Sequence, residues 1–592
     1  MQGHWARLGE PSKKARKEET KSKAEQTVGH VSRRDFLKKA VPVIAGVGLA
    51  GVLGIDRVFA TNPSAAQPNQ GNRIEPASYI IYHGNEYYAQ NGTTGALDFS
   101  GSDAATVIQS AVETLTEGGL IVLRRGVYIL TATITLGHGI YLLGEQGSVL
   151  RVGDGAHSDT NPFNMIEVTG DNVTIDNLEL DGNAQSNPNL AGTTLDPPPA
   201  NPNMQSGILV RSGQNGEIAN CYIHDIWNAG IWLAAIDGDV RGCEITSCQI
   251  QGTGKSQTDP STTNAPQSAS AVYVFRVNGS TSGSIIHDNV IIDVFGQGIY
   301  LHFDTDSIVS DNILSKTPGS SDSTAGIIID DSAKRITIRG NQVSGYGPGI
   351  FIAWAGCEDI IVEANGCFDA PISGGSGYGV LVASSAPWGP QLKTLIVKGN
   401  ICKGNALSGI SVSSSETVIE GNICYNNNQD TAAAPTQRAG IIVQPAGYPL
   451  ISNISINGNR CFDNQPVPTQ NYGLSISQMS NQIADVLIAN NDLRGNGVAA
   501  IGELDCSRSK VIGNLGYNPQ GLAPIQVGAS PFTYTNSDGV PEAVYITGGS
   551  VSQISKNDTP VFTSAPATIW LEPDESVTVV HSDPPQMMKD RH

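Results

Sequence analysis

A short strand-like pattern recurs along the middle of this chain and limits what it can fold into. Ten segments read glycine, aliphatic, any residue, aliphatic, with alanine in place of the glycine in one of them. Successive residues of a strand point to opposite faces, so each segment has one aliphatic, buried face and one variable face. Such repeats predict a solenoid, in which neighbouring coils stabilise one another. The segments begin at Gly207, Gly230, Ala271, Gly298, Gly326, Gly349, Gly379, Gly409, Gly440 and Gly473.

The composition agrees with a β-rich solenoid and excludes several other classes of protein. Only 15% of the 592 residues are charged and 67 are glycine, which argues against coiled coils, helical bundles and highly charged disordered chains. The formal net charge is −20. Because phosphate binding needs a basic patch, we expect no nucleic-acid partner.

The later repeats are each followed by a second aliphatic run that ends in asparagine. Asparagine tolerates left-handed backbone angles, and its amide can bond to the same amide one coil away, so we expect a structural ladder. Two residues further on, an inward position holds cysteine in four coils and Leu, Ile or Val in others. We therefore interpret these thiols as core residues rather than metal ligands or disulfides. The ladder residues are Asn289, Asn312, Asn341, Asn365, Asn400, Asn422, Asn459 and Asn491, and the cysteines are Cys367, Cys402, Cys424 and Cys461.

Strand, turn, asparagine-bearing strand, strand and loop, repeated in this way, resembles the right-handed parallel β-helix of the pectate-lyase superfamily. An amphipathic segment over 104–115, followed by the strand-like run 118–128, is similar to that superfamily's amino-terminal cap, in which a helix covers the open end of the solenoid. The resemblance implies an all-β, single-stranded right-handed parallel β-helix with an N-terminal helical cap over 76–525. Residues 530–585 read as a small C-terminal β module for capping, oligomerisation or carbohydrate contact.

The first 60 residues read as an export signal. The pair Arg33 and Arg34 looks like a twin-arginine motif, and it is followed by an apolar run over 41–55 and a cleavage site ending at Ala60. The apolar run is shorter than the ~20 residues that span a bilayer. We expect a twin-arginine signal over 1–60, a linker over 61–75, and a mature chain without a membrane span. Its location would be periplasmic, cell-surface or extracellular.

In the superfamily that the chain resembles, substrate lies along the outer face of the strand that precedes the asparagine-bearing one. On this face, aromatic side chains occupy consecutive coils, and rings spaced by about 4.8 Å suit an extended sugar polymer. The alternative is that this stripe packs against a neighbouring subunit of a homo-oligomer or under an overlying loop. We predict a groove that binds a polysaccharide substrate, lined by Trp232, Tyr273, Tyr300, Phe351, Trp354, Arg211 and Arg276.

Carboxylates gather at the edge of the stripe. Glycoside hydrolysis needs a carboxylic acid and a carboxylate, and like charges on adjacent coils raise the pKa of one of them. Asp330, Asp331 and Asp304 are the best-placed carboxylates, and His302 could modulate their protonation. Hydrolysis of a glycan by an Asp pair is therefore the favoured interpretation.

Two other functions stay open. A lyase needs a base and positive charge to stabilise an enolate, for which Arg276, His302, Tyr300 and Lys334 could serve. In that case the acidic cluster would hold Ca²⁺; no other metal or cofactor is expected. The third interpretation is a non-catalytic, adhesin-like solenoid that binds glycans.

Overall fold

The computed structural model describes residues 77–591 apart from 158–162, 188–204, 255–268, 318–324, 354–355, 373–375, 384–389, 431, 433–437, 446–447, 477–481 and 518–521. The expected signal and linker lie outside the described residues. Within the described ranges, no helix is long and apolar enough to cross a membrane.

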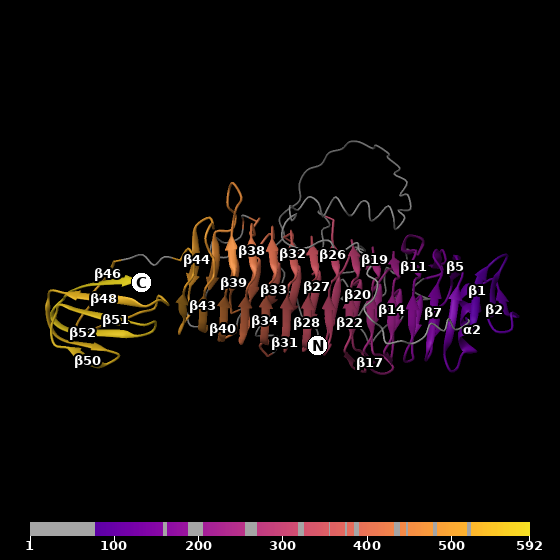
Figure 1. The fold of residues 1–592 in the computed structure, drawn as a ribbon, viewed down its shortest axis with the longest axis horizontal. Coiled ribbons are helices and arrows are strands. Elements are labelled where there is room, and N and C mark those ends of the chain that lie inside the picture. Colours follow the sequence, from indigo (N-terminus) through magenta and orange to yellow (C-terminus); the bar gives the residue numbers. More distant parts are fainter. Residues whose placement is uncertain are drawn as a thin grey trace, which may run out of the picture. The chain divides into compact units, whose positions relative to one another are not determined.

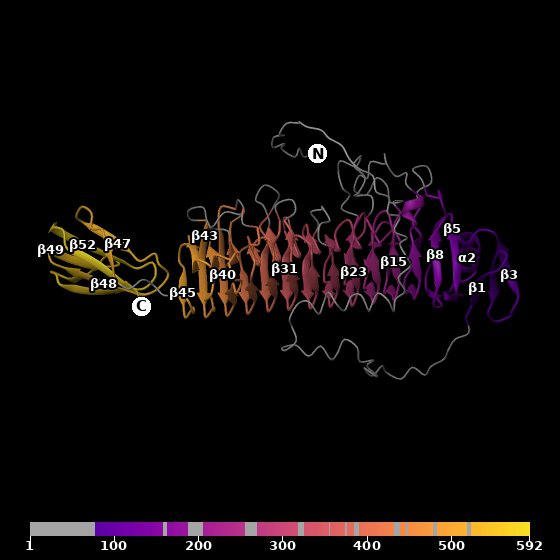
Figure 2. The ribbon, with the colours of Figure 1, turned by 90° about the horizontal axis from the view of Figure 1, so that it is seen from above.

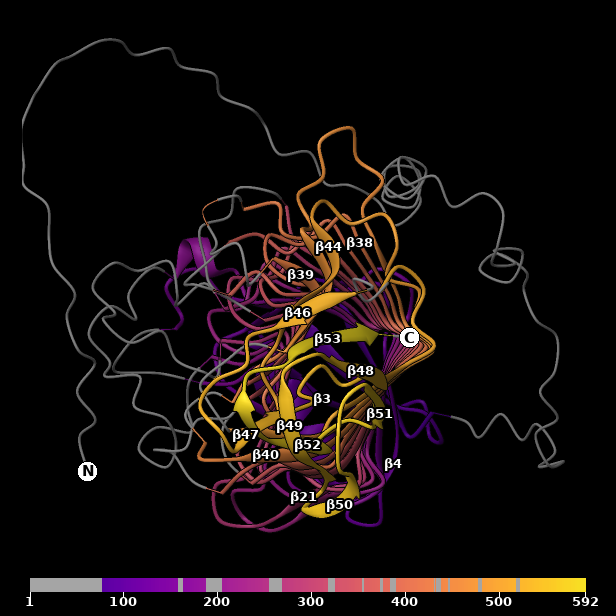
Figure 3. The ribbon, with the colours of Figure 1, turned by 90° about the vertical axis from the view of Figure 1, so that its left-hand side faces the viewer.

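Three long parallel sheets, here called A, B and C, are built from the repeats. Each coil gives one strand to sheet C, one to sheet A and one to sheet B, in that order along the chain. Figures 1 and 2 show strands of successive coils side by side, and Figure 3 looks along the stack. The right-handed parallel β-helix expected from the repeats is confirmed.

Ten of the 13 strands of sheet C come from the repeats that begin with glycine or, once, alanine. These glycines lie where neighbouring coils approach closely: a Cβ on Gly326 would be 2.3 Å from Val343 Cγ1 and 2.7 Å from the Gly349 carbonyl oxygen. A side chain at position 326 would therefore force the neighbouring coil to shift. The strands are β6 (Ile134–Leu136), β9 (Ile166–Val168), β12 (Ile208–Val210), β16 (Ile231–Leu233), β20 (Val272–Phe275), β24 (Ile299–His302), β27 (Ile327–Asp330), β30 (Ile350–Ala353), β33 (Val380–Ala383), β36 (Ile410–Val412), β39 (Ala439–Val443), β42 (Tyr472–Ile476) and β44 (Ala499–Leu504).

Sheet A contains the runs that end in asparagine, and it begins with the antiparallel strands β1, β2 and β3. The Nδ2 of Asn312 donates to Oδ1 of Asn341 at 2.9 Å, and that of Asn341 to Oδ1 of Asn365 at 3.0 Å. The predicted ladder is confirmed, and it continues to Asn514. The strands are β1 (Tyr79–His83), β2 (Tyr87–Asn91), β3 (Leu97–Gly101), β4 (Gly119–Leu123), β7 (Ile140–Gly144), β10 (Thr174–Asp176), β14 (Glu217–Ala219), β18 (Glu244–Thr246), β22 (Ile285–His287), β25 (Ile308–Ser310), β28 (Lys334–Arg339), β31 (Glu358–Glu363), β34 (Lys393–Lys398), β37 (Thr417–Glu420), β40 (Ile451–Asn457), β43 (Ile483–Ala489) and β45 (Lys510–Ile512).

Sheet B carries the column of cysteines. Cys367, Cys402, Cys424 and Cys461 are register partners on successive coils, and all four are buried free thiols. Their assignment to the core is confirmed. The strands are β5 (Gly126–Leu130), β8 (Ser148–Val152), β11 (Glu179–Asp181), β15 (Tyr222–His224), β19 (Gln249–Gln251), β23 (Val290–Ile292), β26 (Ile313–Ser315), β29 (Gln342–Ser344), β32 (Gly366–Phe368), β35 (Ile401–Lys403), β38 (Ile423–Tyr425) and β41 (Arg460–Phe462).

The helical cap is α2 (Ala104–Glu113). It starts where Asp103 Oδ2 accepts a hydrogen bond from the Thr106 backbone N–H at 2.8 Å, the usual device for satisfying a free N–H at a helix start. Val107 and Ile108 lie on its buried face and join the main core. A short 3₁₀ helix, η2 (Ala184–Ser186), and three short strands, β13 (Gly213–Gln214), β17 (Val240–Arg241) and β21 (Thr281–Ser282), complete this part.

Residues 523–591 form two four-stranded antiparallel sheets with a hydrophobic core of their own, which includes Val544, Leu571 and Val577. One sheet has the order β46-β53-β48-β51 and the other β47-β52-β49-β50. The strands are β46 (Ala523–Ile525), β47 (Phe532–Thr535), β48 (Glu542–Thr547), β49 (Ser550–Lys556), β50 (Thr559–Phe562), β51 (Ala567–Leu571), β52 (Ser576–Asp583) and β53 (Gln586–Arg591).

Candidate functional site

The aromatic stripe lies on the outer face of sheet C, as the alternation of residues predicts. Trp232 pairs with Tyr273, Tyr273 with Tyr300, Tyr300 with Ile328, and Ile328 with Phe351 on successive coils. These side chains form a hydrophobic cluster separate from the core inside the solenoid. Residues far apart in the chain are thus lateral neighbours on one exterior face.

The stripe is covered, which differs from the open groove expected from the sequence. Trp232 and Tyr273 are 0% exposed and Tyr300 is 1% exposed. The ring centroids are 5.7 Å apart for Trp232 and Tyr273 and 5.2 Å for Tyr273 and Tyr300, and Phe275 stacks on Tyr273. Alternation shows only that a side chain points away from the interior of the solenoid; what lies over it is decided by contacts distant in sequence.

An acid–base cluster lies at the ends of β24 and β27, where the register brings His302 beside Asp330. The Tyr300 hydroxyl donates to Asp330 Oδ2 at 2.6 Å, and the Asp331 backbone N–H donates to Asp330 Oδ1 at 2.7 Å. His302 Nε2 is 2.7 Å from Asp331 Oδ2. Four of the predicted site residues, Tyr300, His302, Asp330 and Asp331, are therefore linked by direct contacts.

The two carboxylates of the cluster have different surroundings. Asp330 is 1% exposed, and burial raises its pKa to about 6; the Asp331 charge adds to this shift, while the Tyr300 hydrogen bond and His302 oppose it. The Asp331 side chain is 40% exposed, and its Oδ2 lies 2.7 Å from His302 Nε2. Burial thus favours the protonated form of Asp330, whereas Asp331 is in contact with solvent.

Asp304 lies apart from this cluster. It is fully buried, and burial raises its pKa to about 6, while the Thr281 and Ser307 hydroxyls oppose the shift. Phe303, just before it, has a φ of 57°, an uncommon backbone conformation for a bulky residue, and stacks on His302 with centroids 4.2 Å apart. Asp304 is thus a buried carboxyl at the turn after β24 rather than a partner of Asp330.

The two arginines predicted to line the groove make different contacts: one forms ion pairs and the other stacks on a ring. Arg211 bridges Asp237, at 2.6 Å, and Glu167, at 3.6 Å. Arg276 is exposed and lies over the Phe303 ring, 4.9 Å from its centroid. Phe351 is half-buried beside the stripe, and Trp354 lies outside the described residues.

Lys334 and Arg335, near the cluster in sequence, form ion pairs. Lys334 pairs with Glu358 at 2.8 Å and Arg335 with Asp306 at 2.5 Å. Their charges are largely balanced within the turns that follow β27.

Two groups of side chains have the composition of a metal site. In each, the potential ligand atoms lie within 4.8 Å of one another: His302, Asp330 and Asp331 in the first, and Asp181, His224 and Asp225 in the second. The second was not found from the sequence, although the His-Asp pairs at 224–225 and 287–288 were a signal for it.

Protonation of the His224 ring explains why carboxylates surround it. Its Nδ1 is 2.9 Å from Asp225 and its Nε2 is 3.4 Å from Glu179. Burial lowers the pKa of His224, but hydrogen bonds to Asp225 and Glu179, with the nearby Asp181 charge, raise it to about 9. The imidazolium thus balances the surrounding carboxylates.

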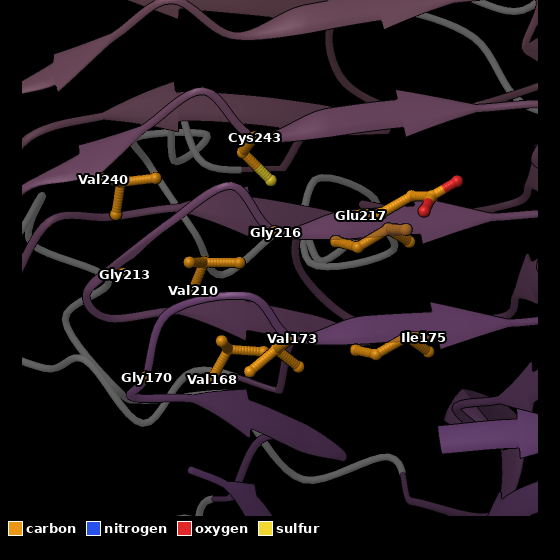
Figure 4. A pocket seen from close by; sticks show the side chains of 11 residues that line it. Val168, Gly170, Val173, Ile175, Val210, Gly213, Gly216, Glu217, Val240 and Cys243 are labelled. Atoms are coloured by element: carbon orange, nitrogen blue, oxygen red, sulfur yellow. The ribbon is translucent and has the colours of Figure 1, made fainter. Parts of the chain in front are cut away.

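The pocket drawn in Figure 4 lies at another place in the solenoid and offers little chemistry. Val168, Val210 and Val240 point into it, together with Cys243. Glu217 at its margin has a pKa raised by burial and by Glu244. Its largely aliphatic lining sets it apart from the acid–base cluster.

Two family descriptions match the chain. "Right handed beta helix region" matches residues 100–265 and 369–558, together more than half of the sequence. "Periplasmic copper-binding protein (NosD)" matches residues 273–366, which contain the acid–base cluster. No curated protein matches the sequence.

Several solved structures are distantly similar. The A-module of the mannuronan C-5 epimerase AlgE6 from Azotobacter vinelandii is 18% identical, with a TM-score of 0.42 over 71% of this chain and 96% of that one. DFA-IIIase from Arthrobacter chlorophenolicus is 14% identical, with a TM-score of 0.40 over 68% and 95%. The surface adhesin PfbA of Streptococcus pneumoniae is also 14% identical, with a TM-score of 0.38 over 69% and 89%. Likenesses this distant carry no information about the chemistry of the cluster.

Proposed function

The chain belongs to the right-handed β-helix family, and on that premise we propose that it is an exported glycoside hydrolase that cleaves a polysaccharide at the Tyr300–His302–Asp330–Asp331 cluster. The observation that carries this proposal is the pairing of a buried carboxyl whose pKa is about 6 with an exposed carboxylate held by His302. Glycoside hydrolysis requires a carboxylic acid and a second carboxylate, and the two carboxyl groups here differ in burial.

In the proposed reaction Asp330 is the general acid and Asp331 the second carboxylate. Asp330 protonates the oxygen of the leaving sugar, and Asp331 attacks the anomeric carbon or activates water. The potential ligand oxygens of the pair lie within 4.8 Å of each other. This short spacing favours a covalent intermediate and retention, because inverting enzymes keep their carboxyl groups about 6.5–9.5 Å apart. Tyr300 acts as a positioning residue through its bond to Asp330.

Two features make β-elimination the weaker alternative. Burial raises the pKa of the Tyr300 hydroxyl, with the Asp330 charge adding to the shift, which makes Tyr300 a poor base for removing a sugar proton. Lys334 and Arg335 are engaged with carboxylates and so are less able to stabilise an enolate. A lyase would release unsaturated sugars that absorb in the ultraviolet, whereas a hydrolase releases reducing ends without that absorbance.

Asp330→Asn and Asp331→Asn test the proposal, with Asp306→Asn as the matched control. Asp306 is an exposed aspartate paired with Arg335 outside the cluster. On a glycan that the unmodified protein cleaves, each cluster variant should release reducing ends at least about 100-fold more slowly, as expected for loss of an acid or base. The control should keep near-normal turnover. Normal turnover in either cluster variant would refute the assigned roles.

Binding without cleavage is the remaining alternative. Retained glycan binding with no products from a broad polysaccharide panel would establish a binding protein and refute the hydrolase.

We also propose export by the twin-arginine route. Replacing Arg33 and Arg34 by lysine should keep the full-length protein in the cytoplasm. Export of this variant at the normal level would contradict that route.

A further inference from the structure

The outer face of sheet A carries a row of mostly aliphatic side chains, one from each of eight successive coils. Its two ends, Ile285 on β22 and Leu487 on β43, are each 39% exposed. Figure 1 shows the strands of these coils following one another along the solenoid. The six side chains between the ends are all partly exposed, and in order they are Ile308, Thr337, Ile361, Ile396, Val418 and Ser455.

Folding of the coils does not require aliphatic side chains at this outward position. The same position holds Glu217 and Glu244 on the two coils before the aliphatic row and Lys510 on the coil after it. The solenoid therefore accepts charged side chains here. A continuous, solvent-accessible aliphatic row is the kind of surface that marks an interaction site.

Charged side chains of alternating sign flank the aliphatic row on both sides and form two charged columns. At the carboxyl ends of β28, β31, β34 and β37 the order is Arg339, Glu363, Lys398 and Glu420. At the amino ends of β28, β31 and β34 the order is Lys334, Glu358 and Lys393. The ion-paired side chains Lys334 and Glu358, and Lys398 and Glu363, are still between 27% and 46% exposed, so they can also face a second molecule.

A two-fold axis that runs along the strands and passes between β31 and β34 brings two copies of this face together with complementary charges. Such an axis reverses the order of the coils, so each charged column faces its own copy in the opposite direction. Side chains of opposite sign then meet throughout: Glu363 with Lys398, Arg339 with Glu420, and Glu358 with Lys393.

The same axis matches the aliphatic row with itself. Ile361 faces Ile396 at the centre, and the two exposed ends, Ile285 and Leu487, face each other. Apolar side chains therefore form the middle of the contact and charged ones its rim, as in specific protein interfaces.

A parallel arrangement of two copies is disfavoured by the same charges. A two-fold axis along the solenoid keeps the order of the coils and places one charged column opposite the other. Side chains of like sign would then meet on each coil: Arg339 with Lys334, Glu363 with Glu358, and Lys398 with Lys393. Because like charges in contact repel, the columns select the antiparallel arrangement.

The contact area suffices for a stable dimer. With coils about 4.8 Å apart the aliphatic row is about 35 Å long, and a six-residue strand such as β31 is about 20 Å long. These dimensions give about 700 Å² on each copy and about 1,400 Å² in total, within the range of specific interfaces.

We propose that the outer face of sheet A binds a second copy of this chain and forms an antiparallel homodimer with its two-fold axis between β31 and β34. This inference does not depend on the proposed glycan cleavage. The acid–base cluster lies at the ends of β24 and β27 in sheet C, outside the interface.

Ile396→Lys tests the apolar centre of the interface. At about 10 µM the full chain should sediment as a dimer, since interfaces of this size reach micromolar affinity or better. The variant places two lysines next to the two-fold axis and should dimerise at least about 100-fold more weakly. Thermal unfolding should show a folded protein, because Lys510 occupies the same outward position on another coil.

Ile313→Lys is the matched control. Ile313 is 37% exposed on β26 in sheet B, so the same substitution is made on an exposed isoleucine of another face. This variant should remain a dimer. A monomeric unmodified chain, an assembly larger than a dimer, a dimer that survives Ile396→Lys, or an equal loss in Ile313→Lys would overturn the inference.

Glu363→Lys and Lys398→Glu test the antiparallel arrangement. Alone, each variant has like charges opposite one another across the axis and should dimerise at least about 10-fold more weakly than the unmodified chain. Mixed in equal amounts, the two variants should form a heterodimer, because the lysines of one face the glutamates of the other. A fluorescent label on one variant identifies the heterodimer during sedimentation.

Mixing does not restore the Glu363–Lys398 ion pair within either chain. Recovery of the dimer therefore reports contacts between chains alone. If the mixture is no more dimeric than the separate variants, the two copies do not meet in the proposed way and the inference is overturned.

Discussion

Replacing Asp330 by asparagine is expected to stabilise the protein at alkaline pH while removing its activity. Burial raises the pKa of this carboxyl from 3.8 to about 6. The folded protein therefore favours the protonated form of Asp330. Its stability falls as the pH rises from 3.8, the ordinary pKa of the carboxyl, through about 6. Asparagine has nearly the same shape and stays neutral at every pH. Its oxygen can accept from the Asp331 backbone N–H while its NH2 donates to the Tyr300 oxygen, as a protonated carboxyl would.

The expected gain in stability follows from the size of the pKa shift. One pKa unit corresponds to about 1.4 kcal/mol, so ionised Asp330 costs about 3 kcal/mol of unfolding free energy above pH 6. The variant should be more stable than the unmodified protein by about that amount near pH 8, and similar to it near pH 4. Denaturant unfolding at the two pH values measures the difference.

Asp306→Asn is the control of opposite sign. The hydrogen bond from Arg335 lowers the pKa of Asp306, so loss of this charge should weaken the protein at pH 8 and not at low pH. If Asp330→Asn lowers stability at pH 8 as much as at pH 4, the carboxyl is not held with a raised pKa and cannot be the proposed acid.

Three further outcomes test the fold. Asn400→Ala removes the amide that donates to Asn422 Oδ1 and accepts from Asn365. Because several buried groups lose partners, the free energy of unfolding in urea should fall by at least about 3 kcal/mol. An unchanged midpoint would contradict the ladder's role. Gly326→Ala should destabilise more than Gly137→Ala, since an added Cβ at 137 meets no atom within 4 Å and neither glycine has a positive φ; equal losses would show that close approach of the coils is not the reason for the glycine. A thiol reductant should leave the melting temperature unchanged because Cys402 and the other cysteines are free, and a fall would reveal a disulfide.

The architecture was accessible from the sequence because it depends on local periodicity. Glycine, or alanine at Ala271, stands where two coils approach closely, and asparagine where its amide bridges coils, so Gly326 and Asn341 mark their turns without knowledge of the rest of the chain. A repeated pattern also specifies register: once coils stack, Tyr300 must lie beside Tyr273, and His302 beside Asp330. A second ladder, in which Asn405 donates to Asn427, escaped notice because longer and more variable loops follow it.

The candidate site was only partly accessible in this way. Alternation placed Tyr300, His302 and Asp330 on one exterior face, but it could not show that the aromatic rings are covered or that Tyr300 bonds to Asp330. The distinction between the carboxyls of Asp330 and Asp331 was equally hidden, since both are the same residue type at adjacent positions. Direction along a strand is a local property of the backbone, whereas burial, and with it the pKa of a carboxyl and the cost of an unpaired hydroxyl, depends on every group that packs around it.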